Sequence, residues 1–123
     1  MIIAIDFDGT CVTHEYPQIG RSIGAEDVLQ KLVAAGHKLV LWTMRSGPYL
    51  EDAKLWFEAR EIPLFGVNEN PNQHVWTDSP KAYAQLYIDD AALGAPLIEP
   101  PGERFYLDWG VTKMWLYRDG VLF

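Results

Sequence analysis

The sequence predicts one α/β domain, with a Rossmann-like parallel sheet of about five strands between two layers of helices. Short apolar runs rich in β-branched residues alternate along the chain with segments whose apolar residues recur at helical spacing. Such alternation implies parallel strands joined by right-handed crossovers, with helices on both faces of the sheet. The 123 residues, 49% of them hydrophobic, can bury one core and leave little for a second. We therefore expect a single domain over residues 1–123.

The first half of the chain predicts two strands and two helices. Residues 2–5 form a continuous apolar run, typical of a strand buried on both faces of a parallel sheet. Apolar residues between 28 and 33 recur at helical spacing until Gly36 ends the helix. Residues 38–43 predict a second buried strand, and Gly47-Pro48 is typical of the start of the next helix.

The second half of the chain contains shorter elements. Residues 64–67 predict a third strand, residues 79–84 a brief helix, and residues 86–88 a fourth strand. Residues 96–98 are a candidate for a short fifth strand. We expect the tail over 100–123 to contain a terminal helix that packs on the core of residues 1–99, with its aromatic residues as packing groups.

Composition narrows the functional classes. A formal net charge of −7 disfavours binding to nucleic acid through a basic surface. The single cysteine, Cys11, excludes an internal disulfide and suits a reducing compartment. The N-terminal segment has no basic stretch and no apolar run of the length that a signal peptide or membrane span requires. We therefore expect a cytoplasmic protein without a membrane partner.

Polar residues collect where the predicted strands end. Ligands bind at the carboxyl ends of the strands in an open parallel sheet, so we expect these side chains to converge. They are Asp6, Asp8, Thr43, Asp89 and Asp90, with Lys81 eight residues before Asp89. Crowded carboxylates raise one another's pKa values unless a cation lies among them. Ligation by oxygen atoms alone favours a hard ion, and the sequence therefore predicts a Mg²⁺ site.

These residues carry a resemblance to a known family. The string Asp6-Phe7-Asp8-Gly9-Thr10, followed in order by Thr43, Lys81 and Asp89-Asp90, resembles the four motifs of the haloacid dehalogenase superfamily. The resemblance spans roughly residues 1–99 and implies phosphomonoester hydrolysis through an aspartyl-phosphate. In these roles Asp6 attacks phosphorus, and Asp8 protonates the leaving oxygen and then activates water.

The resemblance also implies roles for the other motif residues. Thr43 should donate a hydrogen bond to a phosphoryl oxygen, and Lys81 should offset negative charge on the phosphoryl group and on Asp6. Backbone N–H groups from Phe7 to Gly9 could contribute to phosphate binding. The metal ligands would be Asp6, the backbone carbonyl of Asp8, and Asp89. Asp90 would either bind the metal through water or fix Lys81.

Several nearby residues have both a functional and a structural interpretation. Arg45 could clamp a substrate group or be a surface residue at a helix entrance. His14 and Glu15 could touch a leaving group, although a solvated loop explains them better. The polar loop Asn68-Glu69-Asn70, with His74, fits capping and turn chemistry. Cys11 lacks an activating base and is interpreted as a packing residue.

The spacing of the motifs leaves no room for an inserted cap domain, so the chain resembles capless members of the superfamily. An open site suits a phosphorylated macromolecule, or a phosphorylated small molecule if an oligomer partner or the C-terminal tail covers the pocket. The alternative is a catalytically silent module of the same fold that binds phosphate or regulates. A receiver domain is disfavoured because the third strand ends in Val67-Asn68, without an aspartate. A true dehalogenase would not need Asp8.

Overall fold

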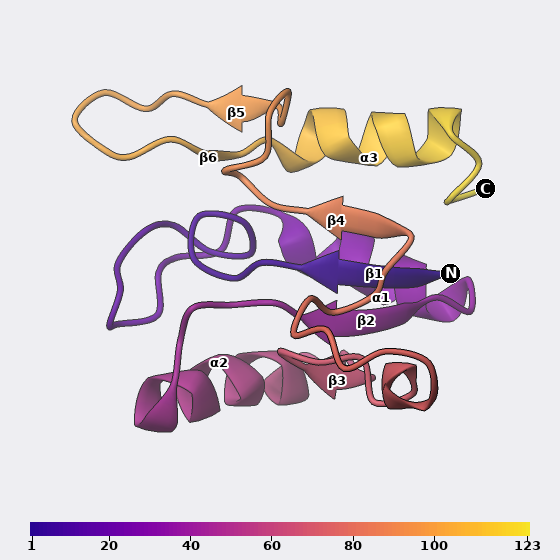
Figure 1. Ribbon diagram of the computed structural model, residues 1–123. Coiled ribbons are helices and arrows are strands. Elements are labelled where there is room, and N and C mark those ends of the chain that lie inside the picture. Colours follow the sequence, from indigo (N-terminus) through magenta and orange to yellow (C-terminus); the bar gives the residue numbers. More distant parts are fainter.

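The computed structural model describes all 123 residues and contains a four-stranded parallel sheet (Figure 1). Its strands are β1 (Ile2–Ile5), β2 (Lys38–Leu41), β3 (Gly66–Val67) and β4 (Leu86–Ile88), in the spatial order β3-β2-β1-β4. β1 is therefore a central strand, paired with β2 over four residues and with β4 over three. This register brings the carboxyl ends of β1, β2 and β4 to one edge of the sheet. The structure confirms the predicted parallel α/β arrangement.

Three helices pack on this sheet. α1 (Ala25–Ala34) buries residues spaced as one helical face, namely Ala25, Val28, Leu29 and Leu32. α2 (Gly47–Ala59) begins with a proline in its first turn and buries Ala53, Trp56 and Phe57. α3 (Trp109–Arg118) is the expected terminal helix, and the side chain of Asp108 caps it by accepting a hydrogen bond from the N–H of Val111. None of the three has the length and apolar character that spanning a bilayer requires.

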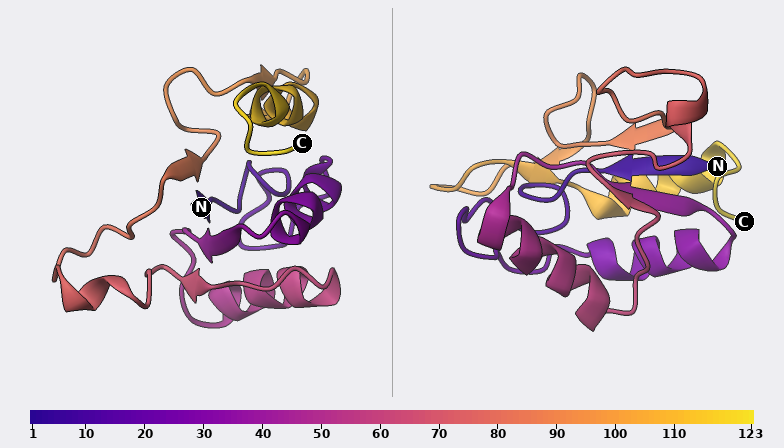
Figure 2. Two further views of the ribbon diagram at one scale, coloured as in Figure 1. Left: turned by 90° about the vertical axis from the view of Figure 1, so that its right-hand side faces the viewer. Right: turned by 60° about the horizontal axis from the view of Figure 1, so that its bottom comes forward.

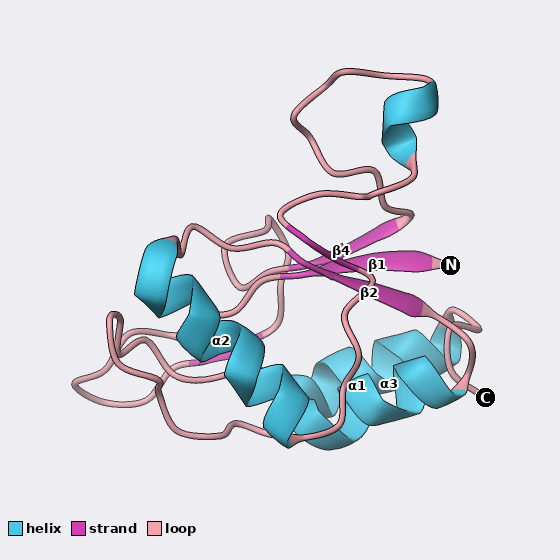
Figure 3. Ribbon diagram, turned by 90° about the horizontal axis from the view of Figure 1, so that it is seen from below, coloured by secondary structure: helices cyan, strands magenta, loops and turns pink.

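All three helices lie on one side of the sheet, so the prediction of helices on both faces is wrong (Figures 2 and 3). The crossovers from β1 to β2 and from β2 to β3 proceed in the same direction across the sheet and carry α1 and α2 on the same face. Only the β3 to β4 connection returns past β1 and β2, on the opposite side. That connection contains no α-helix, only the short 3₁₀ turn η1 (Gln73–Val75).

The brief helix expected over residues 79–84 does not form, and the side chain of Gln73 explains what replaces it. The Gln73 amide donates to the carbonyls of Ser79 and Lys81, at 3.0 Å each, and accepts from the N–H of Tyr83 at 2.7 Å. Pro80 in the same stretch cannot donate a backbone hydrogen bond. The backbone polar groups therefore bond to one buried side chain in place of helical partners.

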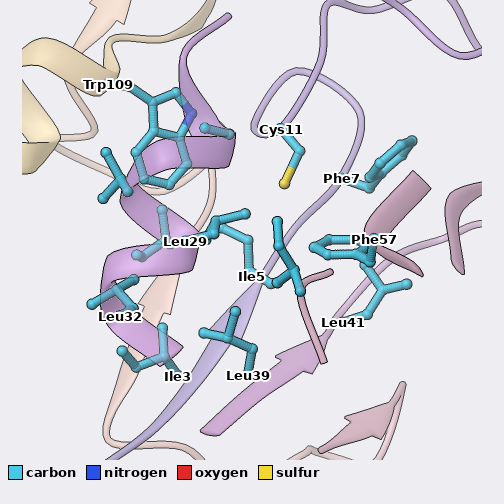
Figure 4. Close-up of a cluster of buried hydrophobic side chains, with 14 of the residues drawn as sticks. Ile3, Ile5, Phe7, Cys11, Leu29, Leu32, Leu39, Leu41, Phe57 and Trp109 are labelled. Carbon is cyan, nitrogen blue, oxygen red and sulfur yellow. The ribbon is translucent and has the colours of Figure 1, made fainter. Parts of the chain in front are cut away.

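The hydrophobic core lies between the sheet and the helices (Figure 4). Side chains alternate along each strand, so Ile3, Ile5, Leu39 and Leu41 face the helices and belong to the main cluster. Figure 4 shows Cys11 in the upper part of this cluster, between Trp109 and Phe7, and Cys11 is fully buried. Burial raises the pKa of the Cys11 thiol well above its ordinary value, as expected for a packing residue.

The predicted fifth strand is present but does not join the main sheet. β5 (Leu97–Ile98) pairs antiparallel with β6 (Tyr106–Leu107) in a separate two-stranded ribbon. The C-terminal region is hydrogen-bonded to the loop after β1: the N–H of Leu107 donates to the carbonyl of Gly9 at 2.9 Å, and the indole of Trp109 donates to the carbonyl of Thr10 at 2.6 Å. These bonds fix the back of the loop that carries the first motif.

Candidate functional site

The loop after β1 positions the two aspartates of the first motif. The carbonyl of Phe7 accepts hydrogen bonds from the N–H groups of Thr10 and Cys11, and Gly9 adopts a left-handed φ of 81° that turns the chain. The Phe7 ring is fully buried in the core. Asp6 and Asp8, the residues before and after it, place their side chains at the edge of the sheet instead. The N–H of Asp6 donates to the carbonyl of Ile88 at 3.0 Å, which holds Asp6 beside the end of β4.

Three carboxylates meet at this point. Asp6, Asp89 and Asp90 each offer an oxygen, and these oxygens all lie within 4.8 Å of one another. Burial, and secondly the charge of Asp89, raise the pKa of Asp6 from 3.8 to about 8. The hydroxyl of Thr10 lies 2.9 Å from Asp6 Oδ2 and 3.1 Å from Asp90 Oδ1, so its single proton serves one carboxylate at a time. No lysine or arginine side chain forms an ion pair with these three carboxylates, so their negative charge is not neutralised by a cationic neighbour of that kind.

The donor set fits a hard divalent cation. All three side chains offer oxygen, and no cysteine or histidine nitrogen is among the clustered groups. The backbone carbonyl of Asp8 accepts no hydrogen bond from the protein, which leaves it available as a further oxygen ligand. Asp6, Asp89, Asp90 and this carbonyl would hold the ion.

Mg²⁺ is therefore expected to stabilise the protein. A cation that binds only the folded state raises the free energy of unfolding by about 2.7 kcal/mol at a concentration one hundred times its dissociation constant. The melting temperature should rise with millimolar Mg²⁺, return to its starting value with EDTA, and stay unchanged with the same ionic strength of NaCl. An equal rise in NaCl would indicate general screening and contradict a specific site.

The carboxylate of Asp8 does not belong to the metal cluster. Its two oxygens pair with Nε and Nη2 of Arg45 at 2.8 and 2.7 Å. Arg45 also donates to the carbonyls of Pro17, Gln18 and Tyr49, so that all five of its N–H groups have protein acceptors. The Arg45 side chain is 1% exposed. Arg45 therefore orients Asp8 and two neighbouring loops. Both sequence-based interpretations, a clamp on a substrate group and a surface residue at a helix entrance, are wrong.

A pocket of about 350 Å³ opens beside Asp6. Thr43, from the end of β2, and Asn68, from the end of β3, line it together with Asp6 and Asp89. The Oδ1 of Asn68 accepts from the N–H of Thr43 at 2.8 Å, and Asn68 holds a left-handed φ of 53°. The Asn68 Nδ2 group and the Thr43 hydroxyl proton have no acceptor in the protein. Both can donate to a ligand in this pocket. Trp42 and Met44 complete the lining of the pocket.

The expected backbone contribution from Phe7 to Gly9 is only partly available. The N–H of Gly9 donates to the carbonyl of Val12 at 2.7 Å, so it is not free for a phosphate, and that prediction is wrong for Gly9. The N–H of Phe7 is directed at the Asp6 carboxylate and lowers its pKa, although burial, the largest effect, raises it. The N–H of Asp8 has no acceptor in the protein.

Lys81 does not converge on the carboxylates in this structure. Its side chain is exposed, and its Nζ lies 5.4 Å from the centre of the Tyr87 ring, in a surface hollow that also includes Trp76 and Tyr83. Lys81 is not among the residues that line the pocket beside Asp6. The cause is local, because the helix that was expected to aim it at the site is replaced by the Gln73-bound segment.

Comparison with known proteins places the chain in a family. The sequence matches no family model and no curated protein. A solved structure of a conserved protein from Bacteroides thetaiotaomicron matches with a TM-score of 0.79 and 36% sequence identity, over 97% of this chain and 91% of the other. The chain belongs to the family of this conserved protein. Because the match spans nearly the full length of both chains, this family shares the small α/β fold with its four-stranded parallel sheet.

Three residues lie at the site although the sequence analysis did not place them among the catalytic or metal-binding candidates. Thr10 bonds to two of the carboxylates, His14 lies 2.8 Å from Asp90, and Asn68 lines the pocket. The position of Asn68 directly after a strand is a signal that could have identified it. His14 lies in an irregular loop, and its interpretation as a solvated side chain is wrong, because it is 13% exposed. Its neighbour Glu15 is exposed, as expected.

Proposed function

We propose that this protein is a cation-dependent phosphomonoester hydrolase of the haloacid dehalogenase type. The observation that carries the proposal is the meeting of Asp6, Asp89 and Asp90 at the carboxyl edge of the sheet, beside a pocket that Thr43 also lines. An anionic cluster of this kind suits Mg²⁺, and the Thr43 hydroxyl suits a phosphoryl oxygen. When bound, Mg²⁺ would offset the charge that an anionic substrate brings next to Asp6.

The protein side chains then divide the reaction into two steps. In the first, a carboxylate oxygen of Asp6 attacks phosphorus, the bond from phosphorus to the leaving oxygen breaks, and Asp8 gives that oxygen a proton. In the second, Asp8 takes a proton from a water molecule, whose oxygen attacks the phosphorus of the acyl phosphate and releases Asp6 and inorganic phosphate. The two bonds from Arg45 hold the Asp8 carboxylate in one orientation for both steps.

Thr43 and Asn68 supply the hydrogen bonds to the transferred group. Their free donors face the same pocket as Asp6, and the bond between Thr43 N–H and Asn68 Oδ1 fixes their relative position. Preorganised donors of this kind stabilise the charge on the phosphoryl oxygens in the transition state. The position of Lys81 gives no support to the charge-offsetting role that the resemblance implies for it.

The substrate is a phosphorylated small molecule or a phosphate carried by a macromolecule. No inserted domain covers the pocket, and Trp42 and Met44 at its edge offer apolar contact to a leaving group. The net charge of −7 makes a polynucleotide end a poor substrate, because its phosphates would be repelled.

The test is phosphate release from an aryl phosphate and from a panel of natural phosphomonoesters. Release is expected with Mg²⁺, not with EDTA, and should be inhibited by beryllofluoride, which forms a stable mimic of the phosphoryl group on Asp6. If the whole panel is left intact while beryllofluoride still binds, the protein is the silent phosphate-binding module of the alternative hypothesis. If neither release nor beryllofluoride binding is observed, both interpretations are excluded.

A further inference from the structure

The His14 side chain contacts the carboxylate cluster through Asp90. Its Nε2 lies 2.8 Å from Oδ2 of Asp90, and both side chains are 13% exposed. The imidazole also lies directly over Gly9, where an added Cβ would collide with the ring and would come within 2.6 Å of Asp90 Oδ2. The absence of a side chain at position 9 is therefore what allows the imidazole to reach Asp90.

Asp90 is held from two sides. Its N–H donates to Thr10 Oγ1 at 3.0 Å, and its Oδ1 lies 3.1 Å from the same hydroxyl. The Thr10 proton, however, is shared with Oδ2 of Asp6, which is closer at 2.9 Å. Whenever Thr10 donates to Asp6, the Asp90 carboxylate still has the bond from His14 to hold its orientation.

We propose that His14 is a positioning residue for the divalent-cation site. Its Nε2–H donates a hydrogen bond to Asp90 and holds the Asp90 carboxylate in the orientation in which it lies beside Asp6 and Asp89. An ionised carboxylate only accepts hydrogen bonds, so Nε2 carries the proton and is not a ligand itself. The bond to Asp90 that the resemblance offered to Lys81 is thus made by a residue of the loop after the first motif. This inference rests on the proposed function, since it concerns the cation of that site.

The experiment compares the affinity of metal-binding variants for Mg²⁺ alone, measured by isothermal titration calorimetry on the whole chain. Loss of a hydrogen bond to a metal-binding carboxylate costs roughly 10- to 100-fold in affinity, and His14→Ala is expected to weaken Mg²⁺ binding by that factor. His14→Gln should stay within a few-fold of the wild type, because its amide N–H can replace Nε2–H. His74→Ala, which changes an exposed histidine in η1, serves as the matched control. The melting temperature of each metal-free variant shows whether it is folded.

Each outcome decides the inference. Rescue by His14→Gln after a loss in His14→Ala supports positioning. Unchanged Mg²⁺ affinity in His14→Ala overturns it, and an equal loss in both variants overturns it in favour of direct coordination by the imidazole. If the wild type releases phosphate and binds Mg²⁺ while His14→Ala binds it equally well, the proposed function stands and only this inference fails. If the wild type binds no Mg²⁺, the two fail together.

Discussion

Replacing Asp6 by asparagine is expected to abolish phosphate release and, in the absence of metal, to make the protein more stable at pH 8. In the proposed mechanism the Asp6 carboxylate attacks phosphorus, so its loss should lower turnover by about three orders of magnitude or more. The gain in stability follows from burial and from the charge of Asp89, which together raise the pKa of Asp6 from 3.8 to about 8. Asparagine keeps the shape of the side chain and carries no charge.

The sign of the pH effect follows from proton counts. Between pH 4 and pH 8 the folded protein retains a proton on Asp6 that the unfolded chain has released, so the free energy of unfolding falls as pH rises through this range. The rise in the pKa of Asp6 from 3.8 to about 8 sets a ceiling of about 6 kcal/mol on this loss, and a few kcal/mol is the expected value. The loss is absent below pH 4, where Asp6 is protonated in both states.

Urea unfolding in EDTA at pH 5 and pH 8 measures this effect. The wild type should lose more stability than Asp6→Asn between the two pH values, and Mg²⁺ should restore the wild type at pH 8 without helping the variant to the same extent. Asp52→Asn, an exposed aspartate on α2, provides the matched control and should follow the wild type. Parallel pH profiles for wild type and Asp6→Asn would contradict the raised pKa.

Replacing Arg45 by alanine is expected to destabilise the fold by about 3–5 kcal/mol, because it breaks a buried ion pair from one side. The variant would leave the Asp8 carboxylate without a cation and would remove the donors that satisfy the carbonyls of Pro17, Gln18 and Tyr49. Burial of the Arg45 side chain means that solvent cannot replace these bonds without local opening.

Urea denaturation followed by circular dichroism would measure this loss. Arg45→Lys tests the geometry separately: an ammonium keeps the charge but cannot reproduce the paired bonds to Asp8, so most of the loss should remain. Arg104→Ala, at an exposed position with no hydrogen bond or ion pair, should change stability by less than about 0.5 kcal/mol. Full stability in Arg45→Lys would show that charge alone is sufficient.

The sequence predicted those strands and helices that have an apolar pattern within a few consecutive residues. The strands at 2–5 and 86–88 and the helical face around Leu29 follow from apolar patterns that span a few residues. The layer arrangement did not follow, because strand and helix alternation suggests a helix in every connection. Between β3 and β4 the side chain of Gln73 takes the backbone hydrogen bonds instead, and such a contact has no periodic signature. The partner of the two-residue strand at 97–98 was equally beyond a local pattern.

Prediction of the site shows the same division. Asp6, Thr43 and Asp89 could be located because each follows a strand, and parallel strands end at one edge. Side-chain pairings across the loops could not be located in this way. Asp8 meets Arg45, 37 residues away in sequence, and Asp90 meets His14, 76 residues away, so that both contacts depend on how the loops fold over the strand ends. Lys81 points away from the site because the helix expected over residues 79–84 is replaced by the segment that is hydrogen-bonded to Gln73.

The strand order has a consequence for the time course of folding. β1, α1, β2, α2 and β3 follow one another in sequence and can assemble through short-range contacts, whereas β4 must return across the sheet to pair with β1. Thr10 and Asp90, which are 80 residues apart, come together only at that step, so it costs more loop-closure entropy than the pairings of β1 with β2 and of β2 with β3 and should follow them. A partly folded chain would therefore hold Asp6 without its two acidic neighbours. The proposed cation site would therefore exist only once β4 has joined the sheet, and a bound ion would report that this strand is in place.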